Sequence, residues 1–297
     1  MSSIKKLNEL TIRDNFLFAA VMQQGDNCKR FLEMLLGIKV ERIHILYEKS
    51  IIYNPEYKGI RMDVYASDER NTCYNIEMQV VRDALPKRSR YYHSQIDMEL
   101  LDSGEDYENL PDSYVIFICD FDPFGEEKYC YSFESLCLEN KSLYLADGSR
   151  SIFLSTKGKN PEEISKELMY FLTFIGEHEP GKSKDYQDAY VEQLQKSIRK
   201  VKQSREMGSK YMSLQLMLRD EYRKGKAEGM AVGMAVGMAE SIILLLESKG
   251  LMTEKLRQRI GEETDLTVLA DMLKAAAKAE APEQFEENMS QGKQART

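Results

Sequence analysis

Three polar residues, Asp63, Glu77 and Gln79, have types and spacing that could bind a cation. Residues 59–80 predict two strands around a short polar turn at 68–72. With this turn, the numbers of paired residues sum to 140, so Asp63 faces Glu77 and Gln79 points to the same side as Glu77. Directly opposed side chains have Cβ atoms roughly 4.5–5.5 Å apart, where like charges repel. A divalent cation between the two carboxylates would turn this repulsion into a binding site.

The alternation along the two strands favours the same register. One side is expected to face the core and comprises Met62, Val64, Tyr74, Ile76, Met78 and Val80. The other side is polar and comprises Arg61, Asp63, Tyr65, Asn75, Glu77 and Gln79. A slip of one residue would bury the carboxylates and expose the apolar set, so the register is well specified. A hairpin with one solvated face and no catalytic role would show the same alternation.

The elements around this hairpin are expected in the order α–β–β–β–α–β. Two short N-terminal helices are indicated by their apolar spacing, with Asp14 and Asn27 as N-caps and Gly37 as a stop. A strand is predicted near Ile43–Tyr47, ahead of the hairpin. A helix is predicted to open at Pro86 and to close near Gly104.

The chain beyond this helix returns to strand patterns. The apolar run at 113–121 predicts a strand buried on both faces. Further strands are indicated at 128–133 and 151–155. An amphipathic helix with proline at its start is indicated at 161–176.

Bulk composition bounds the class of protein. The chain has 297 residues, 42% hydrophobic and 30% charged, which is typical of a soluble globular protein with a charged appendage. Its five cysteines form no C-x-x-C pair and its three histidines are scattered, which argues against structural zinc or a disulfide framework. The N-terminus has no long apolar run, which argues against a signal peptide. The apolar stretch at 229–246 is too short and too often interrupted by Gly or Glu to indicate a membrane span. We therefore expect a cytoplasmic protein without a membrane partner.

The charge is unevenly distributed. The net charge of −8 argues against a general nucleic-acid coat but not against local contacts with DNA. Residues 82–90 carry four positive charges and one negative, and residues 196–226 carry ten positive and three negative. Solvated helix faces and phosphate contacts both explain such segments.

The C-terminal part has a different character. Residues from about 183 to 279 predict charged helices, with glycine at 225, 229, 233 and 237. Small residues on a helix stripe permit close helix packing, so a homo-oligomer through these helices is one interpretation. A repeat-generated linker of little function is the other. The expected division is a domain at 1–180, a charged helical region at 181–280 and a disordered tail at 281–297.

Four blocks in order resemble a known family. They are RDNFLF at 13–18, RMDVYASDERNTCYNIEMQ at 61–79, RYYHSQIDMELLDSGEDYENL at 90–110 and SYVIFICDFDPF at 113–124. With the glycine-rich helical repeat, they resemble the PD-(D/E)XK nuclease family transposases, or recombination-promoting nucleases, over roughly residues 8–180. The resemblance implies an α/β, restriction-endonuclease-like core with a mixed β-sheet flanked by helices, and a helical C-terminal extension.

The resemblance also implies a chemistry. Asp63 and Glu77 would ligate Mg²⁺ (or Mn²⁺) for hydrolysis of DNA phosphodiesters. Gln79 stands where many members of the wider superfamily have lysine, and the nearer family often carries glutamine there; glutamine is neutral and can only orient groups by hydrogen bonds. Asp14 is the candidate for a first-helix catalytic acid, with N-capping as its alternative role. Glu33 is a second candidate, with a solvated helix surface as its alternative.

The helix after the hairpin offers contacts to DNA. Arg88, Arg90, Tyr91 and Gln95 could bind phosphates. These features favour a DNA endonuclease that promotes recombination or transposition by making breaks. A catalytically degenerate nuclease fold that binds DNA or protein is the alternative, and a scaffold built on the C-terminal helices is a third hypothesis.

Overall fold

The computed structural model describes residues 5–47, 49–51, 58–182 and 184–287. The chain divides into two compact units, Met1–Tyr211 and Met212–Thr297. The first unit contains the sheet, and the second is helical in its described part.

A six-stranded mixed sheet forms the centre of the first unit, in the order β1–β4–β5–β6–β8–β7. β5 pairs with β6, and β6 with β8, in parallel, while β1–β4, β4–β5 and β7–β8 are antiparallel. The expected α/β class with a mixed sheet is confirmed. A separate two-stranded ribbon joins β2 to β3. The strands are β1 (Ile43–Tyr47), β2 (Ser50–Ile51), β3 (Ile60–Arg61), β4 (Val64–Asp68), β5 (Cys73–Gln79), β6 (Ser113–Cys119), β7 (Cys130–Phe133) and β8 (Ser149–Ser155).

The β4–β5 hairpin has the predicted register. Val64 pairs with Ile76 and Tyr65 with Asn75, and both pairs of numbers sum to 140. β4 begins at Val64, so Asp63 lies just before the strand. A side-chain hydrogen bond continues the alignment there, because the Asp63 backbone N–H donates to Glu77 Oε1 at 3.1 Å.

The expectation of a solvated polar face is wrong. Every residue of β5 is buried, and Tyr65 is buried as well. The helix α3 (Leu85–Leu100) covers this face, where its Tyr92 and Ile96 join Tyr65 and Phe117 in one apolar cluster.

Two residues expected on the opposite, core side also differ. Met62 belongs to the cluster beneath α3, because the chain leaves the regular ladder between β3 and β4 and the alternation does not continue across Asp63. Val80 follows the last residue of β5 and is exposed.

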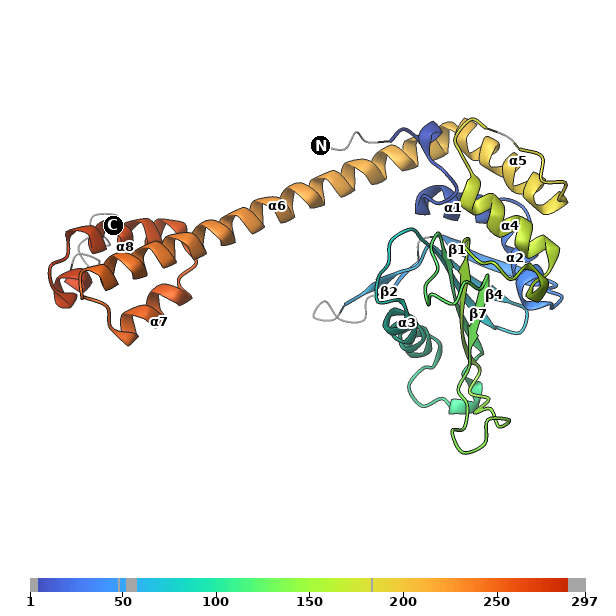
Figure 1. Cartoon of the computed structure of the whole chain (residues 1–297), viewed down its shortest axis with the longest axis horizontal. Helices are drawn as coiled ribbons and strands as arrows, with labels where there is room; N and C mark the ends of the chain where they lie inside the picture. The colour runs from blue at the N-terminus through green and yellow to red at the C-terminus, as the bar shows by residue number, and fades with distance from the viewer. Residues whose placement is uncertain (1–4, 48, 52–57, 183, 288–297) are drawn as a thin grey trace. The chain divides into compact units, whose positions relative to one another are not determined.

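The other helices of this unit group apart from α3, as Figure 1 shows. α1 packs on β5, and α5 packs on α1, α2 and α4. Gly37 ends α2 in the left-handed conformation, as predicted, but Asn27 is the first residue of α2 and Asp26 takes the N-cap position. Pro161 opens a 3₁₀ turn, η3 (Pro161–Glu163), and α4 begins after Ser165, whose Oγ accepts from the Leu168 N–H. The helices are α1 (Asn15–Met22), α2 (Asn27–Leu36), α4 (Lys166–Glu177) and α5 (Ala189–Gln203), with 3₁₀ turns η1 (Leu7–Glu9) and η2 (Tyr107–Asn109).

The first unit extends past residue 180, where a boundary was expected. The reason is α5, which is tied to α2 by buried hydrogen bonds. Asn27 Nδ2 donates to Ser197 Oγ at 2.9 Å, and Tyr190 Oη donates to the Asn27 carbonyl at 2.8 Å. The amphipathic face of α5 therefore completes the core of this unit.

The second unit has a core of its own. α6 (Arg205–Ser248) crosses the boundary between the units, and its C-terminal part packs with α7 (Glu254–Glu262) and α8 (Leu266–Lys278) through Ile242 and Leu246. The expected disordered tail is partly wrong, because residues 282–287 are helical and Phe285 is buried in this core. Residues 288–297 lie outside the described residues.

The glycine repeat lies within α6. A Cβ added at Gly225, Gly229, Gly233 or Gly237 would meet no atom of the described residues within 4 Å, so no close packing among these residues requires glycine there. By length and composition, α6 is also apolar enough over eighteen residues to cross a membrane. Its buried residues Ile242 and Leu246 are engaged in the core of the second unit.

Candidate active site

Asp63 is held between two strands and a helix start. Its side chain is 9% exposed. Asn15 Nδ2, at the first position of α1, donates to Asp63 Oδ2 at 3.0 Å and to Oδ1 at 3.2 Å. The backbone N–H of Met78, in β5, donates to Asp63 Oδ2 at 3.2 Å. These contacts aim the carboxylate across the sheet toward Glu77.

Glu77 is the deepest group of the site. It has no exposed surface, because β5 is an inner strand and α3 covers it. Its Oε1 accepts a hydrogen bond from the Asp63 N–H. Its Oε2 accepts from Arg88 Nη2 at 2.8 Å and from Gln79 Nε2 at 3.4 Å. A fully buried carboxylate thus has one cationic partner.

Burial and mutual repulsion set the charge state of the pair. Burial raises the pKa of Asp63, although hydrogen bonds from Met78 and Asn15 and the charges of Arg88 and Arg61 oppose this. Burial and then the charge of Asp63 raise the pKa of Glu77 to about 8, against the opposing charge of Arg88. A cation at this pair would favour both ionised forms and lower both pKa values.

An amide whose hydrogen bonds are poorly formed lies beside the carboxylates. Asn75 is fully buried on the same side of β5 as Glu77, and neither its Nδ2 nor its Oδ1 has a well-formed hydrogen bond in the described part of the chain. The Asn75 amide lies close enough to Glu77 to lower the pKa of that carboxyl. A buried amide without well-formed hydrogen bonds is costly, and such groups often mark a place for water or an ion. Asn75 was placed on the polar side of the hairpin, but its role was not foreseen.

The donor set fits a hard divalent cation. Two carboxylates and an amide oxygen are all oxygen donors, which suits Mg²⁺ or Mn²⁺ better than zinc. The described residues contain no group of three or more His, Cys, Asp or Glu side chains placed to hold a metal. Asp63 and Glu77 are therefore the carboxylates available at this site, and Mg²⁺ ordinarily completes such a set with waters and substrate phosphate oxygens.

The structure does not bring Asp14 or Glu33 into the cluster. Asp14 Oδ2 accepts from the Thr11 N–H and Oγ1, and Oδ1 accepts from Lys5 Nζ. Asp14 occupies the N-cap position of α1 but makes no capping hydrogen bond with its side chain. Glu33 Oε1 accepts from the Val40 N–H at 3.1 Å. The neighbour of Asp14, Asn15, reaches the site instead, and the RDN run at 13–15 was its only sequence signal.

The four residues expected to contact DNA differ in their surroundings. Arg88 binds the carboxylate cluster, and Arg90 is exposed on α3. Tyr91 Oη donates to the Lys58 carbonyl, and Gln95 lies half-buried one turn farther along.

A basic pocket of about 530 Å³ opens beside the cluster. It lies between the ribbon strand β3 and the first turns of α3. Asp83 is its one acidic lining residue among the described residues. The cationic and aromatic residues that line it are Lys58, Arg61, Lys87, Arg88, Tyr91 and Tyr92.

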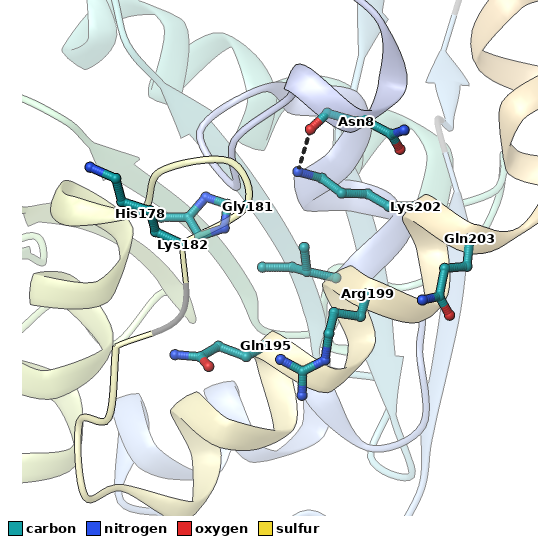
Figure 2. Close-up of a pocket in the computed structure, with 9 residues that line it drawn as sticks. Asn8, His178, Gly181, Lys182, Gln195, Arg199, Lys202 and Gln203 are labelled. Atoms are coloured by element: carbon teal, nitrogen blue, oxygen red, sulfur yellow. Dashed lines mark hydrogen bonds between the residues drawn. The ribbon is translucent and has the colours of Figure 1, made fainter.

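Figure 2 shows a second basic pocket of about 400 Å³, lined by residues of the N-terminal segment, the α4–α5 connection and α5. Lys202 Nζ donates to the carbonyls of Asn8 and Leu10 there. His178 Nδ1 accepts from the Ile12 N–H at 3.1 Å. Among the described residues, no Asp or Glu lines this pocket, so it offers no carboxylate for a cation. Part of the basic segment at 196–226 therefore holds the N-terminal residues in place.

Comparison with known proteins identifies the family of the chain. A family model described as PD-(D/E)XK nuclease family transposase matches residues 16–227, well over half of the chain. The match includes Asp63, Glu77, Gln79 and Arg88 and begins one residue after Asn15. No curated protein and no solved structure matches the chain.

Proposed function

The chain belongs to the PD-(D/E)XK nuclease family transposases, and on this premise we propose that it is a divalent-metal-dependent endonuclease that hydrolyses DNA phosphodiester bonds. Membership supports a hydrolytic nuclease with DNA as its substrate. The observation that carries the finer proposal is the buried Asp63–Glu77 pair: the Asp63 N–H donates to Glu77 Oε1, and the two carboxylates are close enough for the charge of Asp63 to raise the pKa of Glu77. We further propose that the breaks it makes promote recombination or transposition.

Asp63 and Glu77 would hold the ion, Mg²⁺ or Mn²⁺. When bound, such an ion would activate a water molecule for attack on the phosphodiester and would stabilise charge on the scissile phosphate. Asn15 and the Met78 N–H fix the rotamer of Asp63, so this carboxylate is already positioned when no ion is bound.

Gln79 has an orienting role in this proposal. It is neutral, so it neither takes a proton nor neutralises a phosphate. Its Nε2 donates to Glu77 Oε2, and its Oε1 accepts from Arg88 Nη1 at 3.2 Å. Gln79 thus holds Glu77 and Arg88 in fixed positions relative to each other.

The basic pocket beside the cluster is our candidate for the DNA backbone site. Arg61, Lys87 and Arg88 line one concave surface, and Arg88 also contacts Glu77 of the carboxylate pair. Cationic side chains at such a surface bind phosphates without reading sequence. Arg90 and Gln95 remain candidates for contacts farther along α3.

Plasmid cleavage by the full chain tests the function. Supercoiled plasmid is incubated with wild type in Mg²⁺, in Mn²⁺ and in EDTA, beside Glu77→Gln. We expect nicking that needs the metal and that falls to the EDTA background in Glu77→Gln, because the variant loses one of two carboxylate ligands. The matched control is Glu33→Gln, an equivalent change outside the cluster, which is expected to cleave like wild type. Cleavage by Glu77→Gln at the wild-type rate would refute the proposal.

A DNA- or protein-binding module without catalysis is the second candidate. The pairing of Arg88 with Glu77 Oε2 favours it, because a carboxylate already neutralised has less need of a cation. It predicts no cleavage under any metal. If DNA is the partner, affinity should fall steeply as salt rises.

A further inference from the structure

Arg88 lies where the buried carboxylates meet the open pocket. Its guanidinium donates three hydrogen bonds, to Glu77 Oε2 at 2.8 Å, to Gln79 Oε1 at 3.2 Å and to Tyr92 Oη at 2.7 Å. Its side chain is 28% exposed, and it also lines the basic pocket of about 530 Å³. A single side chain therefore borders both the cation site and the surface open to a substrate.

Two aromatic rings hold the guanidinium at this position. Arg88 Cζ lies 5.0 Å from the ring centroid of Tyr92 and 5.8 Å from that of Phe117. A cation over an aromatic face is attracted by the ring quadrupole. These contacts and the bond to Tyr92 do not involve Glu77. The guanidinium would therefore stay at the site if its bond to Glu77 were released.

The charges of the site differ with and without a cation. Without one, Glu77 is paired with Arg88, and the charges of both Arg88 and Arg61 act on Asp63; burial makes the charge of Arg88 strongly attractive to Glu77. A divalent cation alone would balance both carboxylates. Glu77 is the acid that pairs with Arg88 among the described residues, so the charge of Arg88 would then be available to a phosphodiester, which carries a single negative charge.

We propose that Arg88 has two partners in turn: it pairs with Glu77 Oε2 while the site holds no cation, and it binds the substrate phosphate when a divalent cation engages Glu77. The proposal rests on the nuclease function above and adds how the site changes between its metal-free and substrate-bound states. Arg88 supplies the positive charge that the neutral Gln79 cannot.

The two partners of Arg88 predict opposite effects of its removal on metal binding and on catalysis. Arg88 competes with a cation for Glu77 and also repels it, so its removal should strengthen metal binding. It also neutralises the phosphate, so its removal should weaken catalysis. A residue that only supports the fold would not strengthen metal binding when removed.

The test is a calorimetric titration of Mn²⁺ into the full chain, paired with plasmid cleavage at saturating Mn²⁺. For Arg88→Ala we expect Mn²⁺ affinity to rise about tenfold, as removal of one nearby charge of the same sign as the ion predicts. Cleavage by the same variant is expected to fall by about 100-fold or more, the loss expected when one charge-stabilising donor is removed. Arg88→Lys keeps the charge without the two-pronged geometry and is expected to recover part of the cleavage.

Controls distinguish the proposed role of Arg88 from a nonspecific effect of charge and from failure of the proposed function. Lys87→Ala removes an exposed charge one residue away and should leave Mn²⁺ affinity unchanged. If metal-free Arg88→Ala is too unstable for calorimetric titration, thermal melting replaces it. The melting temperature of this variant should then rise more than that of wild type when Mn²⁺ is added. Unchanged or weaker Mn²⁺ binding by Arg88→Ala, or cleavage at the wild-type rate, would overturn the role of Arg88. A wild type that neither binds Mn²⁺ nor cleaves would instead overturn the proposed function itself.

Discussion

Asp63 is held in a state that costs stability when no cation is near. Its carboxylate is buried, and its charge raises the pKa of Glu77 on the neighbouring strand. Hydrogen bonds from Asn15 and Met78 offset part of this cost. Sites that bind an ion commonly keep such unfavourable pairs, because the ion removes the repulsion.

Replacing Asp63 by asparagine should stabilise the metal-free protein. The variant Asp63→Asn loses the repulsion but keeps the Glu77–Arg88 pair, and the Asn15 amide can turn to accept a hydrogen bond from the new side chain. We expect a gain of about 1 kcal/mol, or about 2–4 °C in the melting temperature in EDTA for a unit of this size. In excess Mn²⁺ the order should reverse. A lower melting temperature for Asp63→Asn in EDTA would contradict the assigned repulsion.

Residue types alone could not identify the whole site. Asp63, Glu77 and Gln79 follow from strand alternation and a turn length, both of which are local. Asn15 and Asp14 are adjacent in sequence, and only the direction in which α1 leaves the preceding turn decides which of them reaches Asp63. Arg88 was placed near the site, but its pairing with Glu77 depends on how α3 packs on β6.

At the scale of elements, the covering of both sheet faces determines the site. α3 excludes water from Glu77. The alternation of polar and apolar residues in β5 predicted a solvated face, because the polar residues of this strand belong to a site that is covered by a helix. The register of the hairpin was predictable from its turn. The two short strands of the β2–β3 ribbon were not predicted, since each has only two residues.

The start of α1 is anchored by a histidine after α4, which gives a pH-dependent contact. Burial and then the charges of Lys202 and Arg13 lower the pKa of His178 to about 4, while Asp14 opposes this shift. The neutral ring accepts the Ile12 N–H at Nδ1. A histidine whose folded pKa is depressed contributes stability above its unfolded pKa and loses it as pH falls toward the folded value.

We therefore expect the first unit to lose stability between pH 6.5 and about pH 5. From the ordinary histidine pKa of 6.5 and the folded value of about 4, the His178 contribution to this loss is about 1.5 kcal/mol. Chemical denaturation of wild type and His178→Gln at both pH values measures this contribution. The pH dependence that comes from the other titratable groups is common to both proteins and cancels in the difference. Equal pH dependence in the two proteins would exclude His178 as the cause.

At the scale of the whole molecule, the chain consists of two units with separate cores. The second unit buries Leu246 among residues of α6, α7 and α8, while Leu244 on the same helix is 65% exposed. Self-association through the glycine repeat of α6 stays a prediction, and the mass of the full chain in solution would measure it.

Calorimetry of the full chain should therefore show two unfolding transitions. Leu246→Ala leaves a cavity in the second core and should cost about 2–5 kcal/mol there, so it should lower one transition and leave the other in place. Leu244→Ala is the matched control and should change stability by less than about 0.5 kcal/mol. A single transition that moves as a whole with Leu246→Ala would show that the two units unfold together.

The proposed metal site is measured most directly by a titration of Mn²⁺ into three proteins: wild type, Asp63→Asn and Asp14→Asn. We expect a Mn²⁺ site in wild type that Asp63→Asn loses, because Asp63 is one of the two carboxylates proposed to hold the ion. Asp14→Asn should keep that site, because the Asp14 carboxylate is bound to Thr11 and Lys5. Mn²⁺ binding that survives in Asp63→Asn, or that is lost in Asp14→Asn alone, would contradict the assignment of the metal site to the Asp63–Glu77 pair.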